Sequence, residues 1–313
     1  SSAASDVYKR QEYKKIIFKI IYFSELRAYF SHKELIKSIK NKQSVGLVPT
    51  MGSLHEGHLS LVKRADSENK EVIVSIYVNP TQFNDKEDLK KYPRNIEQDL
   101  EKLQGFDNVI VYTPNDTDLY KENEKSKQYD FGNFINLMEG KYRPGHFDGV
   151  ATIVEKLFKI FTPSNAYFGE KDFQQLLLIK TLTEQLNIST KVIGCETIRE
   201  SDGLAMSSRN SLLSKKERES ASEIIKLLLK AKEMYSKFDL YKIRSAIEKK
   251  AESIDDFMLE YFEIINLSEF SNISKTNNES RAFIACKVGK IRLIDNIKVW
   301  KVEKAIKNIN PSF

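Results

Sequence analysis

Residues 45–65 read VGLVPTMGSLHEGHLSLVKRA, and this stretch decides the fold. Apolar residues at positions 45, 47 and 48 are typical of a buried strand, and Pro49 is expected to end its hydrogen-bond ladder because proline has no backbone N–H. Leu59, Val62 and Ala65 then recur at helical spacing. The stretch therefore predicts a strand, a turn and a helix.

Two of the four histidines of the chain, His55 and His58, lie in this turn, with Gly57 between them. Glycine lets a backbone or a ligand approach closely. A helix N-terminus presents unpaired N–H groups and the positive end of the helix dipole, which suits a polyphosphate. Imidazoles at the same place can add hydrogen bonds or charge. The turn is therefore predicted to bind an anionic ligand and to carry chemistry.

The His-x-Gly-His pattern resembles the signature of Rossmann-like adenylyl- and nucleotidyl-transferring enzymes. The longer string PTMGSLHEGH, residues 49–58, is more specific and resembles the pantothenate synthetase (pantoate–β-alanine ligase) family. The resemblance implies that His58 and His55 are catalytic and that the turn binds ATP. The ATP-binding residues that it implies here are Met51, Gly52, Ser53, Leu54, His55, Glu56, Gly57 and His58.

Two closely spaced histidines could instead be zinc ligands. The metalloprotease pattern, however, needs a spacing of four residues, and a structural zinc site needs about four ligands. The further histidine and cysteine candidates are Cys195, Cys286, His32 and His146. We therefore expect no zinc site and assign no metal-ligating residue, and two merely structural histidines are the plainer alternative.

An apolar, β-branched run at 72–78 predicts a parallel strand that is covered on both faces. It leads into the polar cluster Asn79-Pro-Thr-Gln-Phe83, and open α/β sheets bind ligands at the carboxyl ends of their strands. Without this context, Asn79-Pro80 would indicate only a turn. The family resemblance implies that Gln82 binds pantoate and β-alanine, with Asn79 close by.

The string AYFGEKDFQQ, residues 166–175, repeats the order of strand, turn and helix. Lys171 and Gln175 are four residues apart and would share a helical face. Beside Asp172, a lysine would by default form a surface ion pair of little energy, but near a phosphate its ammonium can stabilise developing negative charge. The resemblance implies a catalytic role for Lys171 and pantoate binding by Gln175. The ATP-binding residues implied here are Gly169, Glu170, Lys171 and Asp172.

A polar loop, IRESDGLAMSSRN, spans residues 198–210. Its Ser-Ser-Arg string offers two hydroxyls and a guanidinium, a suitable donor set for a triphosphate. Alone, the string would indicate a solvated linker. In place, it resembles the second nucleotide-binding signature of this enzyme class. The ATP-binding residues that the resemblance implies here are Ile198, Met206, Ser207, Ser208 and Arg209.

Strand and helix patterns alternate up to about Cys195 and then change to two helices followed by three strands. The alternation predicts an α/β fold with a Rossmann-like parallel sheet, followed by a smaller α+β C-terminal domain. We therefore expect a disordered extension at 1–15, an ATP- and pantoate-binding domain at 16–195 and a C-terminal lid domain at 196–313. The Ser-Ser-Arg string would then reach the triphosphate from the lid.

Three further segments complete the expected chain. The apolar run at 16–23 is predicted to be the first strand, followed by a helix over 24–42. A segment rich in helix breakers, 139–149, matches a loop of the family before a helix predicted at 150–161. His146, within this segment, is expected to stabilise the loop and to have no catalytic role.

Composition narrows the function classes. The net charge of +6 is spread over interleaved lysines and glutamates, so we expect small anionic substrates and no nucleic-acid partner. Two distant cysteines give no disulfide framework and fit a reducing compartment, the cytoplasm. No apolar run approaches the roughly 20 residues that span a bilayer, so no membrane partner is expected. The family resemblance implies a homodimer.

The resemblance covers about residues 20–297 and implies the whole reaction. With ATP and Mg²⁺, pantoate forms pantoyl-adenylate and pyrophosphate, and β-alanine then gives pantothenate and AMP. Two other classes stay open. Cytidylyl- or aminoacyl-type transferases share the His-x-Gly-His pattern, although a tRNA synthetase would need a basic RNA-binding region, which we do not find. An ATP-binding module without catalysis is compatible with the fold alone.

Overall fold

The structure of the protein is a computed structural model that describes residues 26–267 and 279–299. The chain divides into two compact units, 1–212 and 213–313. The extension predicted at 1–15 and the strand predicted at 16–23 lie outside the described residues. Each unit is described by itself below.

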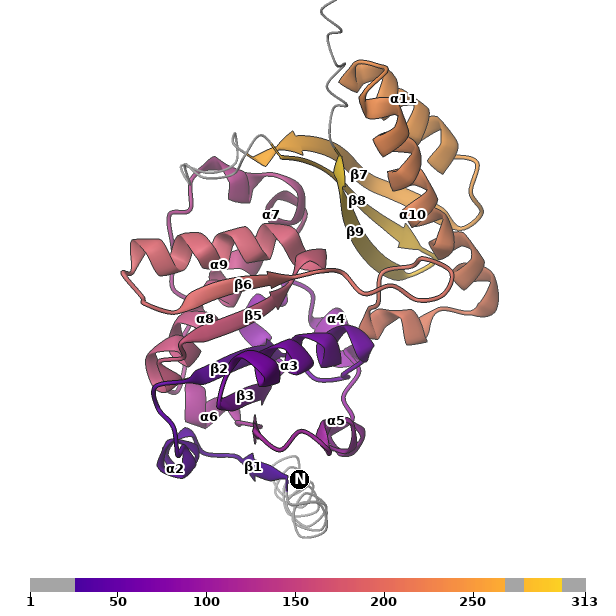
Figure 1. The fold of residues 1–313 in the computed structure, drawn as a ribbon. Coiled ribbons are helices and arrows are strands. Elements are labelled where there is room, and N and C mark those ends of the chain that lie inside the picture. Colours follow the sequence, from indigo (N-terminus) through magenta and orange to yellow (C-terminus); the bar gives the residue numbers. More distant parts are fainter. Residues whose placement is uncertain (1–25, 268–278, 300–313) are drawn as a thin grey trace, which may run out of the picture. The chain divides into compact units, whose positions relative to one another are not determined.

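The first unit is built on a six-stranded sheet in the order β1-β4-β3-β2-β5-β6 (Figure 1). Every neighbouring pair is parallel. The strands are β1 (Arg27–Tyr29), β2 (Val45–Thr50), β3 (Glu71–Ile76), β4 (Val109–Tyr112), β5 (Asn165–Gly169) and β6 (Lys191–Cys195). Nearly all residues of β2, β3 and β4 are buried, which explains their continuous apolar sequences and confirms the predicted Rossmann-like sheet.

Helices follow most of these strands, as the periodicity predicts. The α-helices are α2 (His32–Ser38), α3 (Glu56–Glu68), α4 (Lys86–Lys91), α5 (Ile96–Leu103), α6 (Asp116–Leu119), α7 (Met138–Tyr142), α8 (His146–Phe161) and α9 (Phe173–Gln185). Short 3₁₀ turns are η1 (Pro80–Gln82), η2 (Asn133–Asn136), η3 (Glu170–Asp172) and η4 (Ser208–Leu212). The helix α3 buries Leu59, Val62 and Ala65, the apolar residues that predicted it.

Pro49 does not end strand β2, contrary to the sequence-based expectation. Pairing with β3 continues past it to Thr50, which lies opposite Ile76. Pairing with β5 ends at Leu47, two residues before the proline. The missing N–H of Pro49 therefore limits neither the length of β2 nor its pairing with β3. The turn begins directly after Thr50.

The helix predicted over 24–42 is shorter than expected. Residues Arg27–Tyr29 form β1, paired with β4, and the helix α2 spans only His32–Ser38. Strand pairing at the sheet edge has overridden local helix propensity, which is a weak determinant on its own.

The direction of chain progression through the sheet reverses at β2. From β2 the chain moves outward to β3 and β4, whereas β5 and β6 lie on the other side of β2. Such a switch point leaves a crevice at the carboxyl ends of the strands, where open α/β sheets bind their ligands. The segments that follow β2, β3, β5 and β6 are therefore brought to one place.

The second unit is a three-stranded antiparallel sheet with two helices. Its elements are α10 (Lys215–Tyr235), α11 (Leu240–Ala251), β7 (Phe257–Asn266), β8 (Ser280–Val288) and β9 (Ile291–Val299), in the sheet order β7-β8-β9. A capping box begins α10 at Ser214, whose hydroxyl accepts from the Glu217 backbone N–H and whose own N–H donates to the Glu217 carboxylate. Its α+β character is as expected from the sequence.

The division between the units falls after Leu212 and not near Cys195, where the change of pattern suggested it. The loop 198–210 therefore belongs to the first unit. A hydrogen bond connects this loop to the first unit: Ser208 Oγ donates to the backbone oxygen of Ser53 (3.0 Å) in the turn after β2.

Candidate active site

A pocket of about 240 Å³ lies at the carboxyl ends of β2, β3, β5 and β6, within the first unit. Most of its polar lining comes from the segments after those strands, and its apolar lining includes Val150, Ile153, Val154 and Leu157 of α8. The pocket therefore lies at the switch point that the sheet order predicts.

The turn after β2 is held in an unusual backbone conformation. Gly52 and Ser53 both have positive φ, +78° and +50° respectively. Thr50 Oγ1 accepts from Gly52 N (3.2 Å) and donates to Ser75 O (2.8 Å), which ties the start of the turn to β3. The chain then enters α3 with His55 as its N-cap residue.

Both site histidines use one ring nitrogen as an acceptor for the backbone. His55 Nδ1 accepts from Gly57 N (3.2 Å), and His58 Nδ1 accepts from His55 N (3.3 Å). An accepting Nδ1 carries no proton, so the hydrogen of each neutral ring is on Nε2. A side chain on Gly57 would start 2.9 Å from the His55 ring, which is why glycine is needed between the histidines.

Burial keeps both rings neutral near pH 7. It is the largest cause that lowers the pKa of His55, to about 4, and the charges of Lys171 and Lys102 add to it. The pKa of His58 is also well below its usual value because the ring is buried, with His55 and Lys171 as further causes. The ring centroids lie 4.1 Å apart, so two charged imidazoles would also repel each other.

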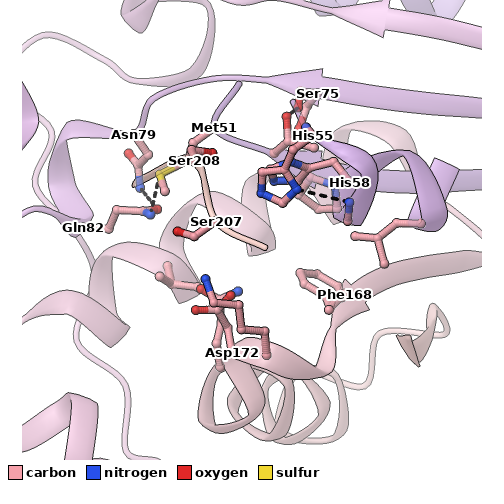
Figure 2. A pocket seen from close by; sticks show the side chains of 18 of the residues that line it. Met51, His55, His58, Ser75, Asn79, Gln82, Phe168, Asp172, Ser207 and Ser208 are labelled. Carbon is pink, nitrogen blue, oxygen red and sulfur yellow. Dashed lines mark hydrogen bonds between the residues drawn. The ribbon is translucent and has the colours of Figure 1, made fainter. Parts of the chain in front are cut away.

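Gln82 lies at another part of the pocket, on the 3₁₀ turn after β3. Its Nε2 donates to Met51 Sδ (2.9 Å), and its Oε1 accepts from Asn79 Nδ2 (3.3 Å). Figure 2 shows Met51, Asn79 and Gln82 together, and His55 beside His58. The amide of Gln82 is thus oriented by side chains from two strand ends.

The start of α8 contacts the 3₁₀ turn that carries Gln82. His146 Nδ1 lies 2.9 Å from the backbone oxygen of Gln82, and Asn79 Nδ2 donates to Gly149 O (3.1 Å). A side chain on Gly149 would start 2.4 Å from Thr81 O, so glycine is required for this contact. His146 therefore stabilises more than its own loop, since it lines the pocket and holds the backbone of Gln82.

The segment after β5 forms the 3₁₀ turn η3 before α9 begins at Phe173. Lys171 lies in that turn and Gln175 in the first turn of α9, and both line the pocket. Asp172, the N-cap residue of α9, makes no side-chain cap bond and also lines the pocket. Both side chains therefore line the same pocket, but they do not share a face of one α-helix as the sequence suggested, because Lys171 precedes α9.

Arg209 completes the pocket from the loop 198–210. Its Nη2 donates to both carboxylate oxygens of Asp88 (3.0 and 2.8 Å), and its guanidinium lies 5.4 Å from the ring centre of Tyr92. Because this loop is part of the first unit, Ser207, Ser208 and Arg209 need no second domain to reach the pocket. The loop therefore no longer supports a lid role for the C-terminal domain, and that role stays a prediction.

Most residues that the sequence indicates do line the pocket. They are Met51, His55, Gly57, His58, Gln82, Gly169, Lys171, Asp172, Gln175, Ile198, Met206, Ser207, Ser208 and Arg209. The remaining indicated residues, Gly52, Ser53, Leu54, Glu56 and Glu170, lie in the same turns without lining the pocket. They shape the backbone that carries the others.

Sequence reasoning assigned no site role to Tyr92, Arg143 or His146, which line the pocket as well. Arg143 Nη1 lies 3.1 Å from His146 Nε2, so the two form one polar group. The only signal for it was the accumulation of helix breakers before α8. Nothing in the sequence analysis indicated a site role for Tyr92.

Metal-ligand clusters and helices that could span a membrane are both absent from the described residues. Among the residues that the structure describes, no group of three or more His, Cys, Asp or Glu side chains could hold a metal ion. No helix within 26–267 or 279–299 is long and apolar enough to cross a membrane.

These features define an α/β enzyme of the Rossmann-like, nucleotide-dependent class, with neutral N–H donors and cationic side chains around one pocket. The sequence matches the Pantoate-beta-alanine ligase family over residues 23–298. The pantothenate synthetase of Flavobacterium psychrophilum is 46% identical over 264 residues, which cover 83% of this chain and 94% of the relative.

Solved structures agree. A pantothenate synthetase structure from Thermus thermophilus has a TM-score of 0.82 at 38% identity, covering 88% of this chain and 100% of the other. The pantoate-beta-alanine ligase of Francisella tularensis, described as complexed with beta-gamma ATP and beta-alanine, has a TM-score of 0.73 at 38% identity and covers 87% of this chain and 97% of its own. The chain belongs to the pantoate–β-alanine ligase family. It is an amide-forming ligase that condenses pantoate with β-alanine at the expense of ATP, through pantoyl-adenylate.

The neutral histidines predict how stability depends on pH. Below about pH 6.5 an unfolded histidine binds a proton, whereas folded His55 does so only near pH 4. The unfolded chain therefore binds more protons in this window, and the free energy of unfolding falls as the pH falls from 6.5 to 4. His55→Gln should reduce this loss by at most about 3 kcal/mol. Urea unfolding of both proteins at pH 7.5, 6.0 and 4.5 measures the difference. The same change of the free energy of unfolding with pH in both proteins would contradict the prediction.

Proposed function

We propose that this pocket holds ATP and pantoate side by side and that pantoyl-adenylate forms there. One observation carries the proposal: the segments that follow β2, β3, β5 and β6 bring to a single pocket the side chains of His55, His58, Gln82, Lys171 and Arg209. The family supplies the reaction, and the pocket supplies groups of the kinds that its two anionic substrates need.

The difficult step brings two anions together. A pantoate carboxylate oxygen attacks the α-phosphorus of ATP, the bond from that phosphorus to the bridging oxygen breaks, and pyrophosphate leaves. We assign to His55 and His58 the donation of Nε2–H to phosphate oxygens, and to Lys171 the stabilisation of the charge that develops on them. The side chains need not act as nucleophiles, because the substrate does so.

Pantoate would be bound by Gln82 and Gln175. A neutral amide can orient a carboxylate and hydroxyls without pairing with the charge that must attack phosphorus. Gln82 is only 7% exposed and its amide is held by Asn79 and Met51, so it is preorganised for this task. We also assign to Gln82 a contact with β-alanine in the second step.

ATP would be bound by the turn after β2, the turn after β5 and the loop 198–210. Their backbone N–H groups, two serine hydroxyls and the Arg209 guanidinium are suited to a triphosphate. The Francisella tularensis relative, described with beta-gamma ATP and beta-alanine, supports both as ligands.

Mg²⁺ fits this site as a partner of the phosphates. The ion is usually bound by one or two carboxylates, waters and substrate phosphates, and the pocket offers the carboxylates of Asp172 and Glu196. We propose these residues as its protein contacts. Bound there, Mg²⁺ would neutralise phosphate charge.

We further propose a homodimer that works in the cytoplasm. The dimer rests on the family resemblance. Both cysteines of the chain, Cys195 and Cys286, are free and buried, which supports a reducing compartment.

The function is tested by following AMP release in the presence of Mg²⁺. We expect release only when ATP, pantoate and β-alanine are all present, and pyrophosphate release with ATP and pantoate alone. AMP release that depends on another acid, or none at all, would favour a different transferase or a binding module.

His58→Ala should lower the rate of pyrophosphate release by roughly 10²- to 10⁴-fold, because the reaction loses a donor to the charge that develops on the phosphates. Circular dichroism should show an unchanged fold. The assay is pantoate-dependent pyrophosphate release under single-turnover conditions. A rate within a factor of a few of the unmodified protein would exclude the assigned role.

Gln82→Ala should weaken pantoate binding more than ATP binding, because its amide is at the end of the pocket formed with Met51 and Asn79. Calorimetric titration with each substrate separates the two effects. If ATP affinity fell and pantoate affinity did not, the two subsites would have to be exchanged.

A further inference from the structure

The turn before the site histidines adopts a conformation that needs external support. Ser53 has a φ of +50°, which costs an L-residue roughly 1–2 kcal/mol, and it follows Gly52 at +78°. Such strained residues persist where neighbouring groups hold them, and they cluster at functional sites. The holding groups come from α5, which lies elsewhere in the chain.

Asp99 of α5 binds two consecutive backbone N–H groups of this turn. Its carboxylate oxygens accept from Ser53 N (2.8 Å) and Leu54 N (2.6 Å). The residue is only 2% exposed, so the bonds replace water that the carboxylate has lost. A side chain on Gly52 would start 2.9 Å from Asp99 Oδ2, which makes glycine necessary for this close approach.

Lys102, one turn further along α5, binds the next peptide group. Its Nζ donates to the backbone oxygen of Leu54 (2.6 Å). That oxygen belongs to the same planar peptide unit as the N–H of His55, and this N–H donates to His58 Nδ1 (3.3 Å). The orientation of one peptide plane therefore connects Lys102 to the ring of His58.

We propose that Asp99 and Lys102 are positioning residues that fix the Leu54–His55 peptide and thereby hold His58 with its proton on Nε2. The proposal rests on the donor role assigned to His58 above. Neither residue lines the pocket, so both act through the turn and not on substrate. Chains of hydrogen bonds through a peptide group also strengthen one another, which favours a single ring state.

The activity test compares Asp99→Asn and Lys102→Met with Glu101→Gln, a matched control at an exposed position of α5. The first two should slow adenylate formation by roughly 10- to 100-fold, with pantoate affinity within about twofold of the unmodified protein. The control should change neither value. In a His58→Ala background, the same two substitutions should reduce the remaining rate less than about twofold, because the group through which they act is gone. Equal losses in both backgrounds would overturn the proposal.

A second readout is independent of catalysis. The ¹⁵N shifts of labelled histidine distinguish Nδ1 from Nε2 protonation, and the chain has four histidines, so His58→Ala assigns the signal. We expect one Nε2–H form in the unmodified protein and a mixture in both α5 variants. An unchanged His58 signal in folded Asp99→Asn and Lys102→Met would refute the positioning role. If His58→Ala proved fully active while the signal changed as expected, the assigned function of His58 would fail and the positioning role would stand.

Charge alone would give a different pattern. Burial is the main cause of the low pKa of His58, and the positive charge of Lys102 contributes to it. Through charge, removal of Lys102 and removal of the negative Asp99 would move the His58 titration in opposite directions. Loss of positioning instead gives the same tautomer mixture in both variants. The sign of the two changes therefore separates the explanations.

Discussion

The backbone must pass from β2 into α3 through two left-handed residues, and the rest of the site depends on this turn. A gentler connection would carry the chain past the sheet edge before the helix began. The sharp turn instead places the N-terminus of α3 directly over the switch point, where the parallel strands leave a crevice. The buried carboxylate of Asp99 replaces water at the N–H groups of the turn. Sheet order and turn geometry thus locate the pocket together.

The pocket separates hydrogen-bond donation from positive charge. His55 and His58 are neutral because they are buried, and their Nδ1 atoms are committed to the backbone, so each offers one N–H. Permanent charge comes from Lys171 and Arg209 at the pocket wall. Neutral donors that are already oriented can bind an entering anion without the free-energy cost of removing water from a further cation. This arrangement can accept a polyphosphate without pairing with the carboxylate that must remain nucleophilic.

The parts that the sequence predicts correctly are those governed by local periodicity and by strings whose residues act near each other. Strand and helix patterns gave the sheet, and the string at 49–58 gave the turn with His55 and His58. The errors have long-range causes: pairing with β4 converts 27–29 into a strand, and the bond from Ser208 to Ser53 draws the loop 198–210 into the first unit. The role of Asp99 could not be predicted from the sequence for the same reason, since its partners lie more than forty residues away.

The ion pair between Arg209 and Asp88 illustrates how weak contacts can serve such a site. The pair is bidentate, yet its side chains are 25% and 38% exposed, and exposed pairs contribute only about 0–1 kcal/mol. A triphosphate carries more charge than one carboxylate and can therefore replace Asp88 at small energetic cost. Tyr92, whose ring lies against the guanidinium, would keep it near the pocket during the exchange. A buried pair would hold Arg209 more tightly, so the partial exposure of this contact is compatible with the ATP-binding role that we propose for Arg209.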